Sequence, residues 1–510
     1  MQSDESGTRC VSACDRGVEV GLGDVLDLPV DQTGPTADFV YVDISSVDRE
    51  SKKILNPKAL SLAEAPSRAK QVLQAGDVLV SMTRPNLNAV ALVPDRLDGA
   101  IASTGFHVLR SSWMKPEFLF YLVQTGQFVD AMCDLVQGAL YPAVRPKDIA
   151  NFKFLLQLPT QQTRIVAKLE ELLSDLDAGV AELKAAQKKL AQYRQSLLKA
   201  AVEGALTAEW RTKNKPTETG AQLLDRILSE RRARWEARQL ARFKEQGKTP
   251  SQDWQKKYPE PVRPDTTGLP ELPQGWVWAT LSQVGWLDRG RSKHRPRNAP
   301  HLYGGPYPFV QTGDVRHANT FLSEVEASYS EAGLAQSRLW PSGTMCITIA
   351  ANIGKTAILS MDACFPDSVV GFLSDSDDVS IRYVEYFMRS VQQNLENEAP
   401  ATAQKNINLE ILEKVKIPVP PSLEQHQVVK LLNDSMDAAR ESDLAIHLSF
   451  KQSAAQRQNI LRAAFSGQLV PQDPGDEPAS VLLERIRAGR AAQPTKMRKA
   501  KSATSRSAAC

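Results

Sequence analysis

The segment from Leu158 to Thr207 constrains the fold of this 510-residue chain more than any other. Between Pro159 and Gly204 it contains no further proline, and its apolar residues recur at alternating steps of three and four. This spacing is typical of one coiled-coil helix, with Pro159 suited to its start and Gly204 to its end. About 45 residues at ~1.5 Å each predict a rod of roughly 65 Å.

The same segment occurs a second time, 263 residues later, with Gln425 in place of Gln162 and Gly467 in place of Gly204. Two unrelated coiled-coil helices could align through their heptads, but heptads alone would not also match the residues before the helix and the Gly-x-Leu end. We therefore predict two equivalent helices that pair antiparallel through their apolar stripes. The expected helix–helix seam comprises Val166, Leu169, Leu173, Leu176, Leu183, Val429, Leu432, Met436, Ile446 and Phe450.

The residues before each long helix are repeated as well. Short strand-like runs broken by Gly, Pro and Asp fill the first part, and Gly343–Ile347 corresponds to Gly76–Val80. One helix is expected from Pro116 to Val129. The predicted fold class is α+β: two mixed α/β domains separated by two long antiparallel coiled-coil helices, in a tandem duplication with pseudo-two-fold symmetry.

This duplication predicts six segments. They are a mixed domain (1–157), a long helix (158–207), a charged helical connector with a linker (208–268), a second mixed domain (269–418), a second long helix (419–469), and a C-terminal helix with a basic tail (470–510).

Composition excludes several protein classes. Apolar residues make up 42% and charged residues 24% of the chain, as in an ordinary globular protein. The net charge of +3 permits local nucleic-acid-binding patches without requiring them. No signal peptide and no apolar run near 18 residues is found, so we expect a cytoplasmic protein without membrane contact. The six cysteines are scattered and are expected to be free thiols: Cys10, Cys14, Cys133, Cys346, Cys364 and Cys510.

No catalytic motif is found. The chain lacks a dinucleotide fingerprint, a DNA-methyltransferase motif, a helicase phosphate loop and a nuclease signature of carboxylates and lysine. Gly354-Lys355-Thr356 superficially resembles a phosphate loop, but Ile349 stands where that motif needs glycine. We therefore expect no catalytic residue, no metal site and no activity of the chain alone.

Two similar but non-identical domains held at a fixed separation suit a partner with its own two-fold repeat, such as DNA half-sites ~34 Å apart. The motifs around the long helices strengthen this interpretation. Ile417-Pro418-Val419-Pro420-Pro421 precedes Glu424-Gln425, and the helix closes at Gly467-Gln468-Leu469. Over nearly its full length the chain resembles the specificity (S) subunit of Type I restriction–modification enzymes. The first copy departs from the pattern, because it lacks the second proline and has Gln161 instead of glutamate.

The resemblance implies a non-catalytic subunit of a Type I site-specific deoxyribonuclease and adenine-N6 methyltransferase complex. Each mixed domain would read one half of a bipartite double-stranded DNA target. The long helices would set the spacer and dock two methyltransferase (M) subunits, and two restriction/translocase (R) subunits would join. No cofactor is expected on this chain, whereas the partner subunits are expected to use S-adenosylmethionine, ATP and Mg. Two alternatives stay open: a coiled-coil scaffold that does not bind DNA, and a stand-alone nuclease.

Candidate base contacts lie in the loop that follows a strand-like run in each domain. Arginine matches the guanine edge and asparagine the adenine edge, although a solvated hairpin turn would have the same composition. The candidates are Thr83, Arg84, Asn86 and Asn88 in the first domain, and Asn352 and Lys355 in the second.

Further candidates precede the last strand of each domain, where the resemblance places DNA-facing residues. They are Tyr141, Arg145 and Lys147, and in the second copy Gln404, Lys405 and Asn406. A basic run supplies candidate phosphate contacts at Arg291, Lys293, Arg295 and Arg297. A second run, from Arg231 to Arg242, is expected to face solvent or a partner subunit.

Overall fold

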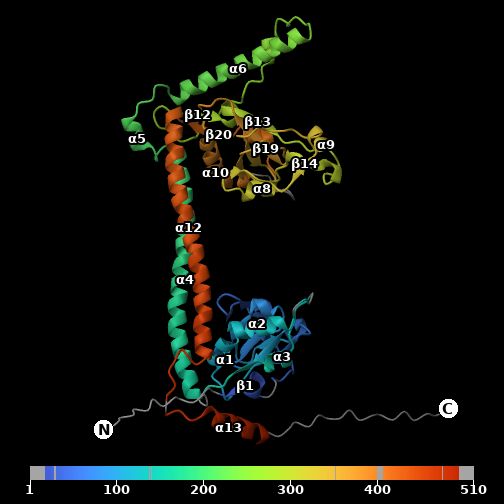
Figure 1. Cartoon of the computed structure of the whole chain (residues 1–510), viewed down its shortest axis with the longest axis vertical. Helices are drawn as coiled ribbons and strands as arrows, with labels where there is room; N and C mark the ends of the chain where they lie inside the picture. The colour runs from blue at the N-terminus through green and yellow to red at the C-terminus, as the bar shows by residue number, and fades with distance from the viewer. Residues whose placement is uncertain are drawn as a thin grey trace, which may run out of the picture. The chain divides into compact units, whose positions relative to one another are not determined.

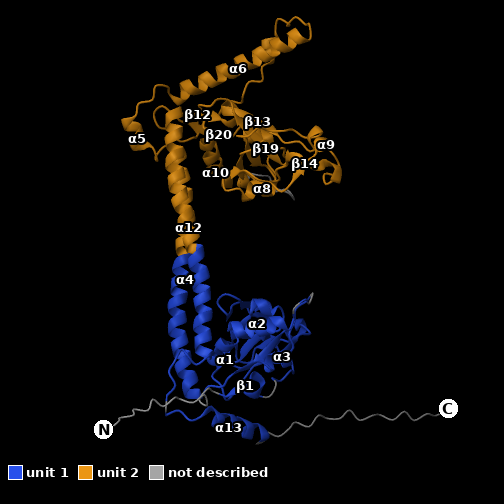
Figure 2. Cartoon of the chain, in the orientation of Figure 1, with its two compact units in different colours: residues 1–184, 447–510 blue, residues 185–446 orange. Residues whose placement is uncertain are grey.

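The computed structural model describes residues 18–27, 30–136, 138, 141–350, 352–398, 406–473 and 475–492. The chain divides into two compact units, residues 1–184 with 447–510 and residues 185–446 (Figure 2). Each unit combines one mixed domain with parts of both long helices, so the predicted α+β class is confirmed.

The mixed domain of unit 1 consists of short strands and short helices (Figure 1). Two sheets form its centre, one with the strand order β10-β7-β8 and one with the order β5-β2-β9-β6. The strands are β1 (Glu19–Gly21), β2 (Phe39–Val42), β3 (Val47–Asp48), β4 (Lys53–Ile54), β5 (Lys58–Leu60), β6 (Ala69–Val72), β7 (Val78–Ser81), β8 (Val90–Leu92), β9 (Ile101–Ser103), β10 (Phe106–Leu109) and β11 (Lys153–Leu155).

Three short helices pack on these strands: α1 (Pro116–Leu122), α2 (Gly126–Asp134) and α3 (Pro146–Ala150). The single helix expected from Pro116 to Val129 is therefore wrong. The chain breaks at Thr125, whose side chain accepts a hydrogen bond from the Phe128 N–H at 3.3 Å and so starts a second helix. Apolar periodicity alone could not reveal the break, because Phe118 and Phe128 are both buried in the same core.

The mixed domain of unit 2 is built around a five-stranded sheet with the order β13-β19-β17-β18-β15. Its strands are β12 (Val277–Thr280), β13 (Gly285–Arg289), β14 (Tyr303–Pro308), β15 (Phe321–Leu322), β16 (Ser328–Tyr329), β17 (Met345–Thr348), β18 (Thr356–Leu359), β19 (Val369–Ser374) and β20 (Lys416–Val419). Its helices are α7 (Leu281–Val284), α8 (Thr312–His317), α9 (Glu331–Ala335), α10 (Ile381–Glu398) and α11 (Leu409–Glu413).

The duplication extends to individual strand pairs. In unit 1 the first strand, β1, pairs antiparallel with the last, β11, and in unit 2 β12 pairs in the same way with β20. The antiparallel pair β7–β10 corresponds to β17–β19. Gly76 and Gly343 precede β7 and β17 with φ of 85° and 84°, a conformation that glycine adopts without strain.

The predicted long helices are α4 (Pro159–Val202) and α12 (Ser422–Phe465), each 44 residues long. Gly204 and Gly467 follow them with φ of 72° and 77°, the left-handed conformation that ends many helices. α4 continues through Gly179 without a break.

The two helices lie side by side and antiparallel within each unit (Figure 1). In unit 1, Arg457 pairs with Asp177, and Leu461 shares a core with Leu169. In unit 2, an Arg194 guanidinium N–H donates to the Ala439 carbonyl oxygen at 3.0 Å, while other α4 and α12 residues share a core.

The seam candidates differ in burial along the helices. Val166, Leu169 and Leu173 are buried together with Phe465 of α12 and Phe118 of the mixed domain, so they face both the partner helix and the domain. Leu432 is buried in the core of unit 2, where Val429 and Met436 are partly buried. The other candidates are half-buried: Leu176, Leu183, Ile446 and Phe450.

One contact distinguishes the two copies at the start of the long helix. Glu424 is buried and accepts hydrogen bonds from Thr207 (2.7 Å), Arg211 (2.9 Å) and Trp276 (3.0 Å). Gln161 occupies the equivalent place in unit 1, and its amide nitrogen is buried without a partner among the described residues. In unit 2 the carboxylate therefore ties the chain that leaves α4 to the start of α12.

A helix follows each long helix and docks on the mixed domain of its unit. α6 (Gly220–Glu245) buries Leu223, Leu224 and Ile227, and α13 (Ala479–Ala492) buries the matching triad, Leu482, Leu483 and Ile486. α5 (Ala208–Lys213) lies between α4 and α6. Each buried apolar side chain stabilises the docking by roughly 1.5–3 kcal/mol.

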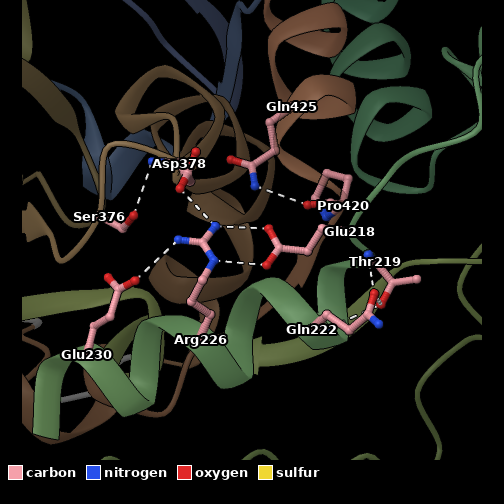
Figure 3. Close-up of polar contacts among 9 residues, drawn as sticks. All are labelled: Glu218, Thr219, Gln222, Arg226, Glu230, Ser376, Asp378, Pro420 and Gln425. Atoms are coloured by element: carbon pink, nitrogen blue, oxygen red, sulfur yellow. Dashed lines mark hydrogen bonds and ion pairs between the residues drawn. The ribbon is translucent and has the colours of Figure 1, made fainter. Parts of the chain in front are cut away.

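An arginine adds a polar contact to the docking of α6. As Figure 3 shows, the guanidinium of Arg226 lies among three carboxylates. It pairs with Glu218 and Asp378 at 2.9 and 2.8 Å, and with Glu230 at 3.5 Å. Since Asp378 belongs to the mixed domain, this network fixes α6 against that domain.

Candidate nucleic-acid interface

In unit 1, the structure brings together the two candidate segments that the sequence separates by some 60 residues. Thr83 and Ala143 form an antiparallel bridge, the Arg84 N–H donates to the Pro142 carbonyl oxygen, and the Val144 N–H donates to the Met82 carbonyl oxygen, both at 2.8 Å. We call residues 82–88 together with 141–145 the first loop pair. It lies where β7, the middle strand of its sheet, ends, so this sheet positions it.

The first loop pair exposes several polar side chains and one aromatic side chain. Thr83, Arg84, Asn86, Tyr141 and Arg145 are all exposed, and 86% of Tyr141 is accessible. Lys147, just beyond the pair in α3, is exposed as well. Such a set combines a planar guanidinium, an amide and an aromatic ring, the groups that contact base edges and sugars.

The backbone of this loop is held in an uncommon shape. Arg84 and Asn88 flank the short turn Pro85–Leu87, and both adopt positive φ, 49° and 41°. A non-glycine residue in this region costs roughly 1–2 kcal/mol, so the surrounding contacts must hold it there. The Asn88 amide donates to the Val123 carbonyl oxygen at 3.0 Å, which fixes the turn to the end of α1. Asn88 is therefore half-buried, unlike Asn86.

Arg145 is exposed but paired. Its guanidinium contacts both carboxylate oxygens of Asp148 at 3.1 Å, and its backbone N–H donates to the same carboxylate at 2.8 Å. These bonds lower the pKa of Asp148 and raise that of Arg145, because each stabilises the charged form of the partner. Asp148 thus orients Arg145 at the start of α3.

In unit 2 the equivalent segments meet in the same way. Ala350 and Asn406 form an antiparallel bridge, and the Ile407 N–H donates to the Ile349 carbonyl oxygen at 3.0 Å. We call residues 349–350, 352–355 and 406–407 the second loop pair. Asn406 is exposed, whereas Gln404 and Lys405 lie outside the described residues.

The second loop pair differs from the first in how its side chains are held. The Lys355 ammonium donates to Gln392 of α10 at 3.1 Å, so Lys355 is half-buried. Asn352 is also half-buried, and its carbonyl oxygen accepts a hydrogen bond from the Thr348 hydroxyl. Gly354 has φ 74°, and a side chain there would approach Gln392 to about 3.1 Å. The two loop pairs therefore share a backbone arrangement but differ in the side chains that they expose.

The basic run lies at the same end of the five-stranded sheet as the second loop pair. β13 ends at Arg289, opposite Val370 of β19, and β17 ends at Thr348, opposite Val369. We call residues 289–297 the basic loop. Its first residues are anchored, since the Arg291 N–H donates to the Phe365 carbonyl oxygen at 3.0 Å.

The cations of the basic loop are not equivalent. Arg297 contacts both oxygens of Asp367 at 2.8 and 2.9 Å, and Arg295 donates to the Ser292 and His294 carbonyl oxygens. Arg291 lies 3.8 Å from Asp288. Lys293 is exposed and has no ion-pair partner within the part of the chain that the structure describes. Lys293 is thus the most available charge for an anionic partner.

Lys52 borders the first loop pair and was not among the sequence candidates. Its ammonium donates to the Asn88 carbonyl oxygen at 2.6 Å, and burial lowers the pKa of Lys52 to about 8. It lines a cleft of about 380 Å³ together with Asn86 and, from α12, Arg457. No local pattern predicts this, because Lys52 meets Asn88 only through the tertiary fold.

The described residues form no metal site and no membrane-spanning helix. Among the described residues, no group of three or more His, Cys, Asp or Glu side chains is arranged to hold a metal ion. In the same part of the chain, no helix combines the length and apolar character that a membrane span needs. Cys133, Cys346 and Cys364 are free thiols, and the other three cysteines fall outside the described residues.

Comparisons with known proteins converge on one family. Residues 273–441 match the Type I restriction modification DNA specificity domain. The chain is 24% identical over 398 residues to the Type I restriction enzyme EcoDI specificity subunit of Escherichia coli, covering 76% of this chain and 79% of that one. It is 23% identical over 456 residues to the HindI specificity subunit of Haemophilus influenzae, covering 84% and 94%.

A solved structure is similar as well. It comes from a study of complex assembly and conformational transition of the type I R-M system. One of its chains superposes with a TM-score of 0.68 at 26% identity, covering 89% of this chain and 98% of that chain.

Proposed function

We propose that this chain, a member of the specificity subunits of Type I restriction enzymes, reads a bipartite DNA sequence with its two mixed domains. One observation carries the proposal. The first and second loop pairs share a backbone frame, with the Thr83–Ala143 bridge repeated as Ala350–Asn406, while their exposed side chains differ. A repeated frame with changed side chains is what two readers of different half-sites require.

Within this proposal the two kinds of contact have separate roles. Arg84 and Asn86 in the first loop pair, and Asn406 in the second, are exposed and of the types that recognise base edges. Lys293 of the basic loop and Lys147 beside the first loop pair contact phosphates, which fix position without specifying sequence. Tyr141 offers a flat, exposed ring beside Arg84 for packing on sugar or base.

The long helices set the length of the unspecified spacer between the two half-sites. A 44-residue helix spans roughly 65 Å, and each unit holds α4 and α12 through its own contacts. The exposed flanks of these helices dock two M subunits, and two R subunits join the assembled complex. The partners supply methylation and cleavage with S-adenosylmethionine, ATP and Mg, and this chain supplies the choice of sequence.

The experiment that tests the proposal is a map of methylated adenines in DNA from cells that co-express this chain with its M subunit. The expected result is one motif of two short specific parts around a fixed unspecified gap. A well-formed complex without any modified motif would contradict the proposal and favour the scaffold alternative. Cleavage of DNA by the purified chain alone would favour the nuclease alternative.

A further inference from the structure

α6 is longer than its docking on the mixed domain requires. Only its first turns enter the core, through Leu223, Leu224 and Ile227, yet the helix continues to Glu245. We call residues 231–257 the arm: the rest of α6 and the returning segment, which ends in the short helix Trp254–Lys257. The arm lies wholly within unit 2, and neither loop pair includes any of it.

Aromatic contacts fix the returning segment on the helix. The rings of Trp235 and Trp254 stack with centroids 5.8 Å apart, and Tyr258 meets Trp235 edge-on at 5.4 Å. Phe243 contacts Trp254 edge-on at 6.0 Å. These aromatic side chains therefore contact one another and hold the returning segment against α6, which gives the arm a defined structure.

The arm concentrates the positive charge of the protein. It contains nine Lys or Arg and three Asp or Glu residues, a net charge of +6, whereas the whole chain carries +3. The remainder of the chain is therefore net negative. Within unit 2 some of these charges are neutralised: Arg231 lies 3.2 Å from Asp375, and Arg232 lies 3.4 Å from Glu260.

Five arm cations are exposed and have no ion-pair partner among the described residues: Arg238, Arg242, Lys244, Lys248 and Lys257. Arg231, Arg234, Arg238 and Arg242 share one face of α6, because they follow each other at helical spacing. The first two contact the mixed domain: Arg231 donates to the Ser282 carbonyl oxygen, and Arg234 to that of Asp375. The free guanidinium groups thus extend the face that already borders this domain.

We propose that the arm binds the phosphate backbone of duplex DNA just outside the half-site read by the mixed domain of unit 2. This inference rests on the proposed function and adds a sequence-independent contact to it. Closely spaced exposed cations without ion-pair partners suit phosphates. A protein partner fits less well, because protein interfaces have apolar centres and few lysines, and Leu240 is the large apolar side chain that the arm exposes.

The test compares two duplexes that carry the methylated motif. One ends just beyond the half-site of unit 2, and the other continues there for about two helical turns, ~20 bp. Binding of the full chain, assembled with its M subunits, is measured over a range of salt concentrations. Arg238→Gln/Arg242→Gln and Lys244→Gln/Lys248→Gln are the arm variants. Lys213→Gln/Lys215→Gln is the control, since it removes two exposed charges outside the arm.

The slope of log affinity against log salt should be steeper for the long duplex than for the short one in the wild-type complex. Each arm variant should reduce that slope by about 1.8, or ~0.9 for each lost phosphate contact, on the long duplex only. The control should match wild type on both duplexes. Arm variants with the wild-type slope on the long duplex would overturn the inference, and poor assembly at unchanged slope would assign the arm to a protein partner. A missing motif in the wild-type complex would instead contradict the proposed function.

Discussion

Gln162 and Gln425 make the same two hydrogen bonds in the two copies of the repeat. The Gln162 side-chain oxygen accepts the Lys115 N–H at 2.8 Å, and the Gln425 oxygen accepts the Ser380 N–H at 2.9 Å. Each amide nitrogen donates to the carbonyl oxygen five residues earlier, at 2.8 and 3.0 Å. Both side chains are almost fully buried. Gln162 thus fixes the N-terminus of α1 to the start of α4, and Gln425 fixes the N-terminus of α10 to the start of α12.

Replacing either glutamine should lower the local stability of its own unit and leave that of the other unit unchanged. Gln162→Leu leaves the part-buried Lys115 N–H at the start of α1 without its acceptor, which costs about 1 kcal/mol. Hydrogen exchange should become faster in residues 115–122, with no change in α10, and Gln425→Leu should give the converse. Gln192→Leu, at an exposed position of α4, is the matched control. Equal exchange in the variants and the control would show that the hydrogen bonds of Gln162 and Gln425 do not stabilise α1 and α10.

Arg84 is expected to specify bases in only one half of the target. Its side chain is exposed on the first loop pair, and a bidentate contact to a guanine contributes about 1–3 kcal/mol of discrimination. Arg84→Ala should relax one position of the motif in a methylation map and leave the other half unchanged. Asn406→Ala should relax the other half instead. Uniform weakening over the whole motif would mean that Arg84 contacts backbone only.

Lys293 and Arg297 should respond differently although they lie in the same basic loop. Lys293 has no ion-pair partner in the described part of the chain, so Lys293→Gln should reduce the salt dependence of DNA binding by about 0.9 in slope. Arg297 already contacts Asp367, so Arg297→Gln should reduce it less. Neither variant should alter the motif. The same slope for Lys293→Gln and wild type would remove this loop from the DNA interface.

His107 should make the stability of unit 1 depend on pH. Burial lowers the pKa of His107 to about 4 from 6.5, and its Nε2 has no partner among the described residues. The unfolded chain therefore binds a proton at higher pH than the folded chain does. Stability should fall between pH 6.5 and 4, by about 2–3 kcal/mol from this group.

His107→Leu removes the titrating group and places an apolar side chain opposite Val80 on β7. Thermal unfolding measured at pH 7.5 and pH 5 should show a smaller difference for the variant than for wild type. Equal differences would indicate that His107 is protonated as readily in the folded protein as in the unfolded chain.

The sequence predicts the architecture because the duplication supplies an internal comparison. Gln162 with Gln425, and Gly204 with Gly467, occupy matching places in the structure as the 263-residue shift indicates. The class of fold and the antiparallel long helices follow from apolar spacing and from this repeat.

The sequence could not predict contacts made across the fold. Lys52 reaches Asn88 from 36 residues away, and Asp367 reaches Arg297 from 70 residues away. Such partners decide which candidate cation or amide is free, and no local pattern encodes them. The break between α1 and α2 at Thr125 could not be predicted either. It depends on one hydroxyl group that caps α2, whereas the apolar spacing continues across it.

If each mixed domain reads its own half-site, exchanging one domain should change one half of the target only. The most direct measurement exchanges residues 20–157 for the corresponding domain of another specificity subunit and maps the methylated motif of the complex. We expect a new sequence in one half, with the other half and the gap length unchanged. A change in both halves, or in neither, would contradict this expectation.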